Sequence, residues 1–280
     1  MFKEALKKFH KNYGYYLAVF LIPVFGFFLM NRLLNLVGAT RINFFSIINQ
    51  PIVFFNKIAL DKLIDSVTNQ IIGINGLLTL ISTLFIAYLF IMLLRSIFLK
   101  LNFPATRIME SAYFKSSPKQ AILLPLKLFF TQFSIFLASS LLWTGLNFII
   151  SQLFARNSFA SFFVMVGVIV LTIITVPIAF LVAYDIEGNY NFLTTITKGL
   201  SIGLRHFWQI AKTILAQFLI VALITFVFVC IGIILVALFH SQTLIEIYIA
   251  FGIGFAVFWT FPFCIIYMAE TMNKLFEKEY

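Results

Sequence analysis

Long apolar blocks alternate with short polar segments along this chain. Six blocks reach the roughly 20 residues that a helix needs to cross a bilayer; they cover about 15–36, 71–94, 128–152, 161–184, 210–239 and 246–270. Barrel strands would instead show short stretches of alternating polarity, a pattern that this sequence lacks. Because backbone groups in lipid must bond within their own segment, each block predicts a helix. We therefore expect an all-α, polytopic transmembrane helical bundle with about six spans.

The composition points the same way. Hydrophobic residues make up 62% of the chain, charged residues 11%, and the mean hydropathy is +1.03. A soluble domain is about half apolar and a quarter charged. The longer connections, about 37–70, 95–127 and 185–209, leave no room for a soluble domain. The sequence thus predicts a single integral membrane domain over residues 1–280.

The Lys and Arg residues predict the orientation. If the N-terminus is inside, the inner segments hold fifteen of the 20 basic residues and the outer segments hold five. Basic loops favour the cytoplasmic side, so we expect both termini in the cytoplasm and place the chain in a bacterial inner membrane. The net charge of +10 is then explained by inner loops beside anionic lipid headgroups, without nucleic acid.

Three polar segments have amphipathic character: residues 1–13, 51–67 and 189–207. In the first, Phe2, Leu6 and Phe9 share one helical face and lysines occupy the other. In the third, Phe192 and Ile196 belong to one apolar stripe. Such segments are typical of helices that lie in the headgroup plane. The alternative is that each is a connector whose apolar face rests on neighbouring spans.

An offset of 85 residues relates the second half of the chain to itself. It pairs "TVP" at 175–177 with "TFP" at 260–262, and the acids that follow each apolar run also match. The matched positions include Thr175 and Thr260, Pro177 and Pro262, Lys127 and Lys212, Gln132 and Gln217, Gly167 and Gly252, and Asp185 and Glu270. We predict two copies of a two-span unit, 95–185 and 186–280, in parallel orientation. Residues 1–94 form the N-terminal spans; whether they are a third copy is open, because their second span lacks the proline.

The paired prolines predict kinks. Proline removes a backbone donor and clashes with the preceding turn. Thr175 and Thr260 stand two residues earlier, where a hydroxyl can bond a carbonyl one turn back. The kinks either let helices pack around neighbours or shape a cavity that gates a path.

The search for reactive groups finds no catalytic, cofactor or metal site, so we do not expect an enzyme. The sequence contains no P-loop, HExxH or CxxC pattern, and the depths of Cys230 and Cys264 predict two free thiols. Ionisable residues fall at span ends, where snorkelling accounts for them. The residues that would line a polar path are Gln132, Gln217, Asn147 and Thr225, although bonds between helices explain them equally well.

The segment "GLSIGLRHFWQIAKTILAQFLIVALI", 199–224, together with the "TVP" and "TFP" spans, resembles bacterial YciC-like proteins and the membrane domain beside some glycerophosphodiester phosphodiesterases. The resemblance covers about residues 100–275. It implies a multi-span inner-membrane module, mostly of undefined activity, and carries no catalytic residues across.

Three functions compete at this point. A non-catalytic scaffold, accessory subunit or envelope-related module would have tightly packed spans. A transporter or channel for a small or amphipathic solute would have a cavity lined by the Gln, Asn and Thr residues named above. A membrane enzyme would need acids or histidines clustered at one depth, which the sequence does not offer. The first reading is favoured and the second is the alternative.

Overall fold

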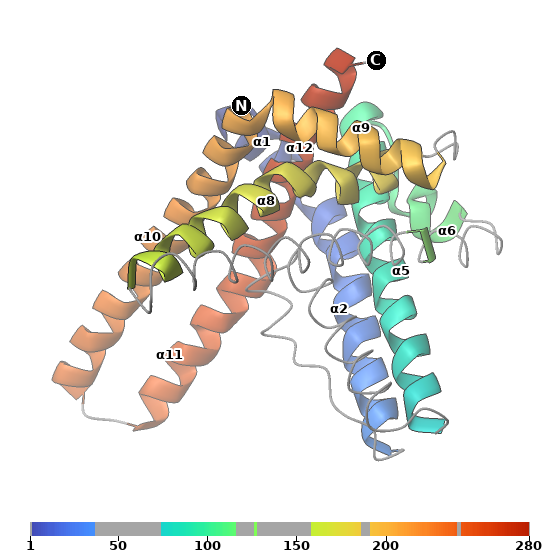
Figure 1. Ribbon diagram of the computed structural model, residues 1–280. Coiled ribbons are helices and arrows are strands. Elements are labelled where there is room, and N and C mark those ends of the chain that lie inside the picture. The colour runs from blue at the N-terminus through green and yellow to red at the C-terminus, as the bar shows by residue number, and fades with distance from the viewer. Residues whose placement is uncertain are drawn as a thin grey trace. The chain divides into compact units, whose positions relative to one another are not determined.

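The computed structural model describes residues 2–36, 74–115, 126–127, 158–185, 191–239 and 242–279 (Figure 1). Within these ranges the regular elements are all helices, with no strand, so the all-α class is confirmed. Three helical stretches in the described part are long and apolar enough to cross a membrane: Tyr13–Leu33, Phe207–Ala237 and Thr243–Glu279. They fit an integral membrane protein. The predicted span 128–152 and the segment 51–67 lie outside the described residues.

The chain divides into two compact units, which are described separately. Unit 1 combines Met1–Phe20 with Trp208–Tyr280, and unit 2 is Leu21–Phe207. Unit 1 contains α1 (Phe2–Lys11), the first turns of α2 (Tyr13–Leu36), α10 (Phe207–Phe239), α11 (Gln242–Phe255) and α12 (Phe261–Glu279). Unit 2 contains the rest of α2, α5 (Ile74–Asn102), the short turn Ile108–Glu110, α6 (Ala112–Lys115), α8 (Ser158–Tyr184) and α9 (Phe192–Arg205).

In unit 1, α10 forms an antiparallel hairpin with α11 and α12. The Thr213 and Thr271 hydroxyls lie 3.4 Å apart near one end. Toward the other end, the Tyr248 hydroxyl donates to the Phe228 carbonyl. Figure 1 shows α10 and α11 side by side. Polar side chains therefore join α10 to α12 near one end and to α11 toward the other, as is common between membrane helices.

A column of stacked aromatic rings follows one face of unit 1. Phe255, Trp259, Phe263 and Tyr267 recur every four residues, and successive ring centroids lie 5.4, 5.4 and 6.1 Å apart. The column crosses a π-helical turn, Ala256–Thr260, between α11 and α12. Helix α1 packs against α12, and the Phe9 ring lies 5.6 Å from that of Phe263. The column is thus the surface on which the N-terminal helix rests.

In unit 2, α9 packs closely on α8 through two glycines. A Cβ added to Gly203 would lie 2.1 Å from the Ile174 carbonyl oxygen, and one added to Gly199 would lie 2.4 Å from Ile178 Cγ1. Only a residue without a side chain permits this approach. On α5, Phe98 packs edge-on against Phe180 and Tyr184 of α8. Unit 2 is therefore built around α8, which contacts both α5 and α9.

Candidate functional site

Pro177 lies inside α8, which continues through it from Ser158 to Tyr184. In a regular helix its missing amide would have bonded the carbonyl of Ile173, four residues earlier. The Thr175 hydroxyl bonds the Leu171 carbonyl at 2.9 Å and the Thr172 carbonyl at 3.2 Å. Thr175 thus bonds carbonyls one turn back, as the sequence predicts. Neither of them is the Ile173 carbonyl, which loses its donor to the proline.

Pro262 stands in the first turn of α12, directly after the π-helical turn. This widened turn is one of the recognised ways in which a helix absorbs a local distortion. The buried hydroxyl of Thr260 makes no hydrogen bond within the part of the chain that the structure describes. The two prolines therefore occupy different backbone settings, although they match in sequence.

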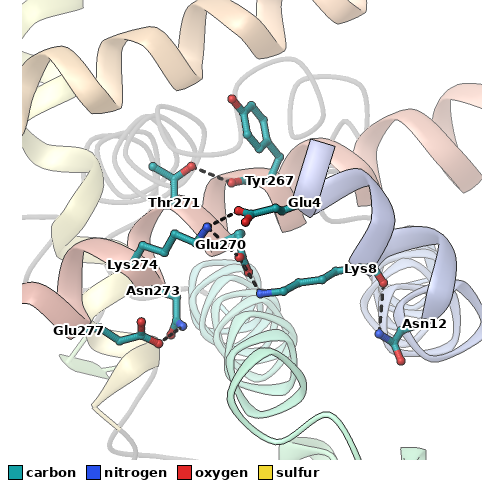
Figure 2. Close-up of polar contacts among 9 residues, drawn as sticks. All are labelled: Glu4, Lys8, Asn12, Tyr267, Glu270, Thr271, Asn273, Lys274 and Glu277. Atoms are coloured by element: carbon teal, nitrogen blue, oxygen red, sulfur yellow. Dashed lines mark hydrogen bonds and ion pairs between the residues drawn. The ribbon is translucent and has the colours of Figure 1, made fainter. Parts of the chain in front are cut away.

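Four charged side chains meet where α1 packs on α12, and we call them the Glu270 cluster: Glu4, Lys8, Glu270 and Lys274 (Figure 2). The Lys8 ammonium lies 2.6 Å from Glu270 Oε1. Lys274 lies 3.6 Å from the same oxygen and 2.5 Å from Glu4 Oε2. The Glu270 side chain is only 2% exposed, whereas that of Lys8 is 45% exposed. A buried carboxylate is thus held by cations that reach it from the protein surface.

The matched acid of unit 2 is also buried and paired, and we call its group the Asp185 cluster: Arg95, Lys127 and Asp185. Lys127 Nζ lies 3.2 Å from Asp185 Oδ2, and the Arg95 guanidinium donates to the Asp185 backbone carbonyl at 2.6 Å. Burial lowers the pKa of the Arg95 guanidinium, and the Asp185 carboxylate opposes that shift. An arginine still keeps its charge at neutral pH, so the guanidinium donates to this carbonyl as a cation.

These clusters correct the interpretation of the span-end charges. Snorkelling would place Asp185 and Glu270 in the headgroup region, but their side chains are 3% and 2% exposed. Each is neutralised by a cation from a distant part of the chain. Lys127 and Lys212, which match at the offset of 85, also have different surroundings, because Lys212 is exposed. No local pattern in the sequence points to Lys8 as the partner of Glu270, because the two residues are 262 positions apart.

The amphipathic segments 1–13 and 189–207 form helices that rest on other helices, the alternative kept open for them. Ala5 and Phe9 are the buried residues of α1. In α9 the buried residues are Thr195, Gly199, Ile202 and Gly203, which is a different face from the Phe192 and Ile196 stripe. The exposed side chains of α9 include Leu193 and Leu204 as well as Lys198 and Arg205, so its outer surface mixes apolar and basic groups.

The residues expected to line a polar path are only partly described. Gln217 Nε2 donates to the Cys264 carbonyl at 2.8 Å and so joins α10 to α12. Thr225, on the same helix, is exposed. Gln132 and Asn147 lie outside the described residues. Gln217 thus has the role of a bond between helices, which the sequence could not separate from a lining role.

Within the described residues, no group of three His, Cys, Asp or Glu side chains is placed to hold a metal ion. Cys230 and Cys264 are free thiols, as the sequence predicts. Comparison of the chain with protein-family models, with curated proteins and with solved structures finds no match.

Proposed function

We propose that this chain is a multi-pass protein of the bacterial inner membrane with about six spans, and that it works as a non-catalytic scaffold, accessory or envelope-related module. Anionic lipid headgroups at the cytoplasmic face are its proposed contacts. The resemblance to YciC-like proteins and to the membrane domain beside glycerophosphodiester phosphodiesterases favours the same class.

The observation that carries this proposal is that polar side chains form ion pairs and hydrogen bonds between helices. The buried Glu270 binds Lys8 of α1, and Gln217 binds a backbone carbonyl of α12. Thr213 and Thr271 join α10 to α12 in the same way. Ion pairs and hydrogen bonds that are closed within the protein stabilise one arrangement of helices. A path for a solute would need such groups to be available to the solute.

The acids that follow the two proline helices support the proposed repeat of 95–185 and 186–280. The offset of 85 relates Asp185 to Glu270, and both acids are buried and ion-paired. In the proposed repeat the two acids would be neutralised differently, because Lys127 pairs with Asp185 whereas its match, Lys212, is exposed.

A pair of substitutions on α10 tests scaffold against transport. Gln217→Ala removes the bond to Cys264, whereas Thr225→Ala changes an exposed residue of the same helix. A scaffold predicts a lower melting temperature in detergent for Gln217→Ala alone. Complementation of a deletion strain by the Gln217→Ala variant should then fall only in proportion to the loss of folded protein. A transporter predicts normal stability and lost complementation for either variant, which would overturn the proposal.

Cysteine labelling tests the proposed orientation. Lys198→Cys and Lys115→Cys should react only with reagents that enter the cytoplasm, and Asn157→Cys should react from outside. Labelling of Lys198→Cys from outside would overturn both the orientation and the parallel repeat.

A further inference from the structure

Two short helices of this chain lead into long helices through the same break. Helix α1 ends at Lys11 and α2 begins at Tyr13; α9 ends at Arg205 and α10 begins at Phe207. At the single residue between them, the Asn12 amide donates to the Lys8 carbonyl at 3.1 Å and the His206 amide to the Ile202 carbonyl at 2.9 Å. The two breaks are 194 residues apart. The offset of 194 residues therefore aligns α1 with α9, and it is obtained independently of the matched prolines.

Each short helix packs on a proline helix in the same register. Gly203 lies against Ile174, and Gly199 against Ile178. Subtracting 194 from the residue numbers in α9 and adding 85 to those in α8 gives the contacts expected between α1 and the second proline helix. They are Phe9 against Trp259 and Ala5 against Phe263.

The first of these expected contacts is present, with ring centroids 6.0 Å apart. For the second, Ala5 is fully buried. The Phe263 ring meets both Phe2 and Phe9, the aromatic residues on either side of Ala5. The two shifts come from different features, a helix break and a proline, and they agree on one docking register.

The short helices also follow one order along the chain. Helix α9 leads into α10 and packs on the preceding helix α8. Helix α6 follows α5 and packs on it, and the Ala112 amide donates to the Ser96 hydroxyl at 3.1 Å. Helix α1, the first helix that the structure describes, packs on α12, the last one described.

We propose that residues 1–94 are the first of three copies of one two-span unit, and that α12 carries a docking surface whose occupant is the N-terminal helix α1. The surface consists of Phe263, Tyr267 and Glu270 of α12, together with Trp259 of the π-helical turn that precedes it. This inference rests on the repeat proposed above and extends it to the N-terminus. In this scheme each short helix packs on the second span of another copy: α6 on α5, α9 on α8 and α1 on α12. The ion pair of Lys8 with Glu270 is specific to the contact of α1 with α12, since α9 has Ile202 at the position that matches Lys8.

Engineered disulfides at matched positions test the proposal. The background carries Cys230→Ser and Cys264→Ser, with a protease site inserted between Asp185 and Asn191. One chain then carries Gly199→Cys with Ile178→Cys, whose Cβ atoms would lie 3.1 Å apart, slightly nearer than the roughly 3.5–4.5 Å of a disulfide. The second carries Ala5→Cys with Phe263→Cys. The control, Leu6→Cys with Phe263→Cys, turns the first cysteine by about 100° around the helix.

After oxidation and cleavage, cross-linked halves run together on a non-reducing gel. We expect comparable yields from the 199–178 and 5–263 pairs, several-fold above the 6–263 control. A cross-link at 199–178 without one at 5–263 overturns the third copy but leaves the two-copy repeat standing. Failure of both pairs, or equal yields at 5–263 and 6–263, also overturns the proposed register.

A charge exchange covers the case in which the cysteine variants do not fold. Lys8→Glu and Glu270→Lys should each lower the melting temperature, and the double exchange should recover most of the loss, because the pair is re-formed with its signs reversed. Lys7→Glu, on an exposed neighbour of Lys8, should give no such rescue. A double exchange that is no more stable than the single variants overturns the docking of α1 on α12.

Discussion

The hydroxyl of Tyr13 donates a hydrogen bond to the carbonyl oxygen of Phe258 at 3.1 Å. Phe258 stands four residues before Pro262, so in a regular helix its carbonyl would receive the amide hydrogen that proline lacks. A side chain from the N-terminal part of unit 1 thus supplies a donor to a carbonyl in the turn before the proline. The proline and the docked N-terminus are linked through this bond.

A double-mutant cycle tests that link. Tyr13→Phe should destabilise the protein by about 0.6 kcal/mol, the average for hydrogen bonds between membrane helices. Pro262→Ala restores a backbone donor, so the same Tyr13→Phe change should cost much less in the Pro262→Ala background. Thermal melting of the four proteins in detergent gives the coupling. Equal costs in both backgrounds would mean that the Tyr13 hydroxyl does not compensate for the proline.

The two matched lysines are expected to differ sharply. Lys127→Ala removes a cation that pairs with the buried Asp185 carboxylate, and we expect a loss of about 3 kcal/mol for a broken buried pair. Lys212→Ala changes an exposed side chain and should alter stability by less than about 0.5 kcal/mol. Melting temperatures of the two variants compare these effects directly. Similar losses would contradict the assignment of Asp185 as a buried, paired acid.

Glycines in unit 2 offer a second matched comparison. Gly203→Ala places a Cβ 2.1 Å from the Ile174 carbonyl oxygen, and a backbone atom cannot move aside cheaply, so we expect a loss of about 1–3 kcal/mol. Gly167→Ala meets no atom within 4 Å and should stabilise α8 by about 0.5–1 kcal/mol. Chemical denaturation of both variants measures the difference. A neutral Gly203→Ala would show that α9 does not pack against α8 as closely as described.

The Glu4 carboxylate gives a pH-dependent signal for the docking of α1. Its hydrogen bond with Lys274, together with that cation's attraction, lowers the pKa of Glu4. The contact therefore stabilises docking above the ordinary glutamate pKa of about 4.3, and this contribution disappears as the pH falls through the lower, folded-state pKa. Lys274→Met should raise the pKa of Glu4, whereas Lys278→Met should not. An NMR titration of labelled glutamate, assigned with Glu4→Gln, would refute the contact if neither variant moved the pKa.

The sequence predicts the helices well because apolar length alone determines them. The predicted blocks 15–36, 161–184 and 210–239 correspond to α2, α8 and α10, whose bounds differ from them by at most three residues. The ends marked by charges are less accurate. The predicted block 71–94 stops before Arg95, whereas α5 continues to Asn102, because Arg95 bonds inside the protein.

Partners of the candidate residues are harder to predict than the residues themselves. Pro262 and Glu270 stand out in the sequence, but the groups that bond there, Tyr13 and Lys8, come from the opposite end of the chain. Neither carries a pattern that names its partner. Gly199 and Gly203 have a regular spacing, yet only the packing of α9 on α8 shows which face they belong to. Contacts between distant segments depend on packing, which periodicity does not encode.

The central claim is that the proline helices are structural surfaces for docked helices, rather than gates. The most direct measurement is the melting temperature of Pro177→Ala and Pro262→Ala in detergent, alongside complementation of a deletion strain. Restoring a backbone donor at either proline changes the geometry of the helix that holds α9 or α1, so we predict a lower melting temperature for both variants, with complementation falling only as folded protein is lost. Variants that keep or gain stability but fail to complement would contradict the claim.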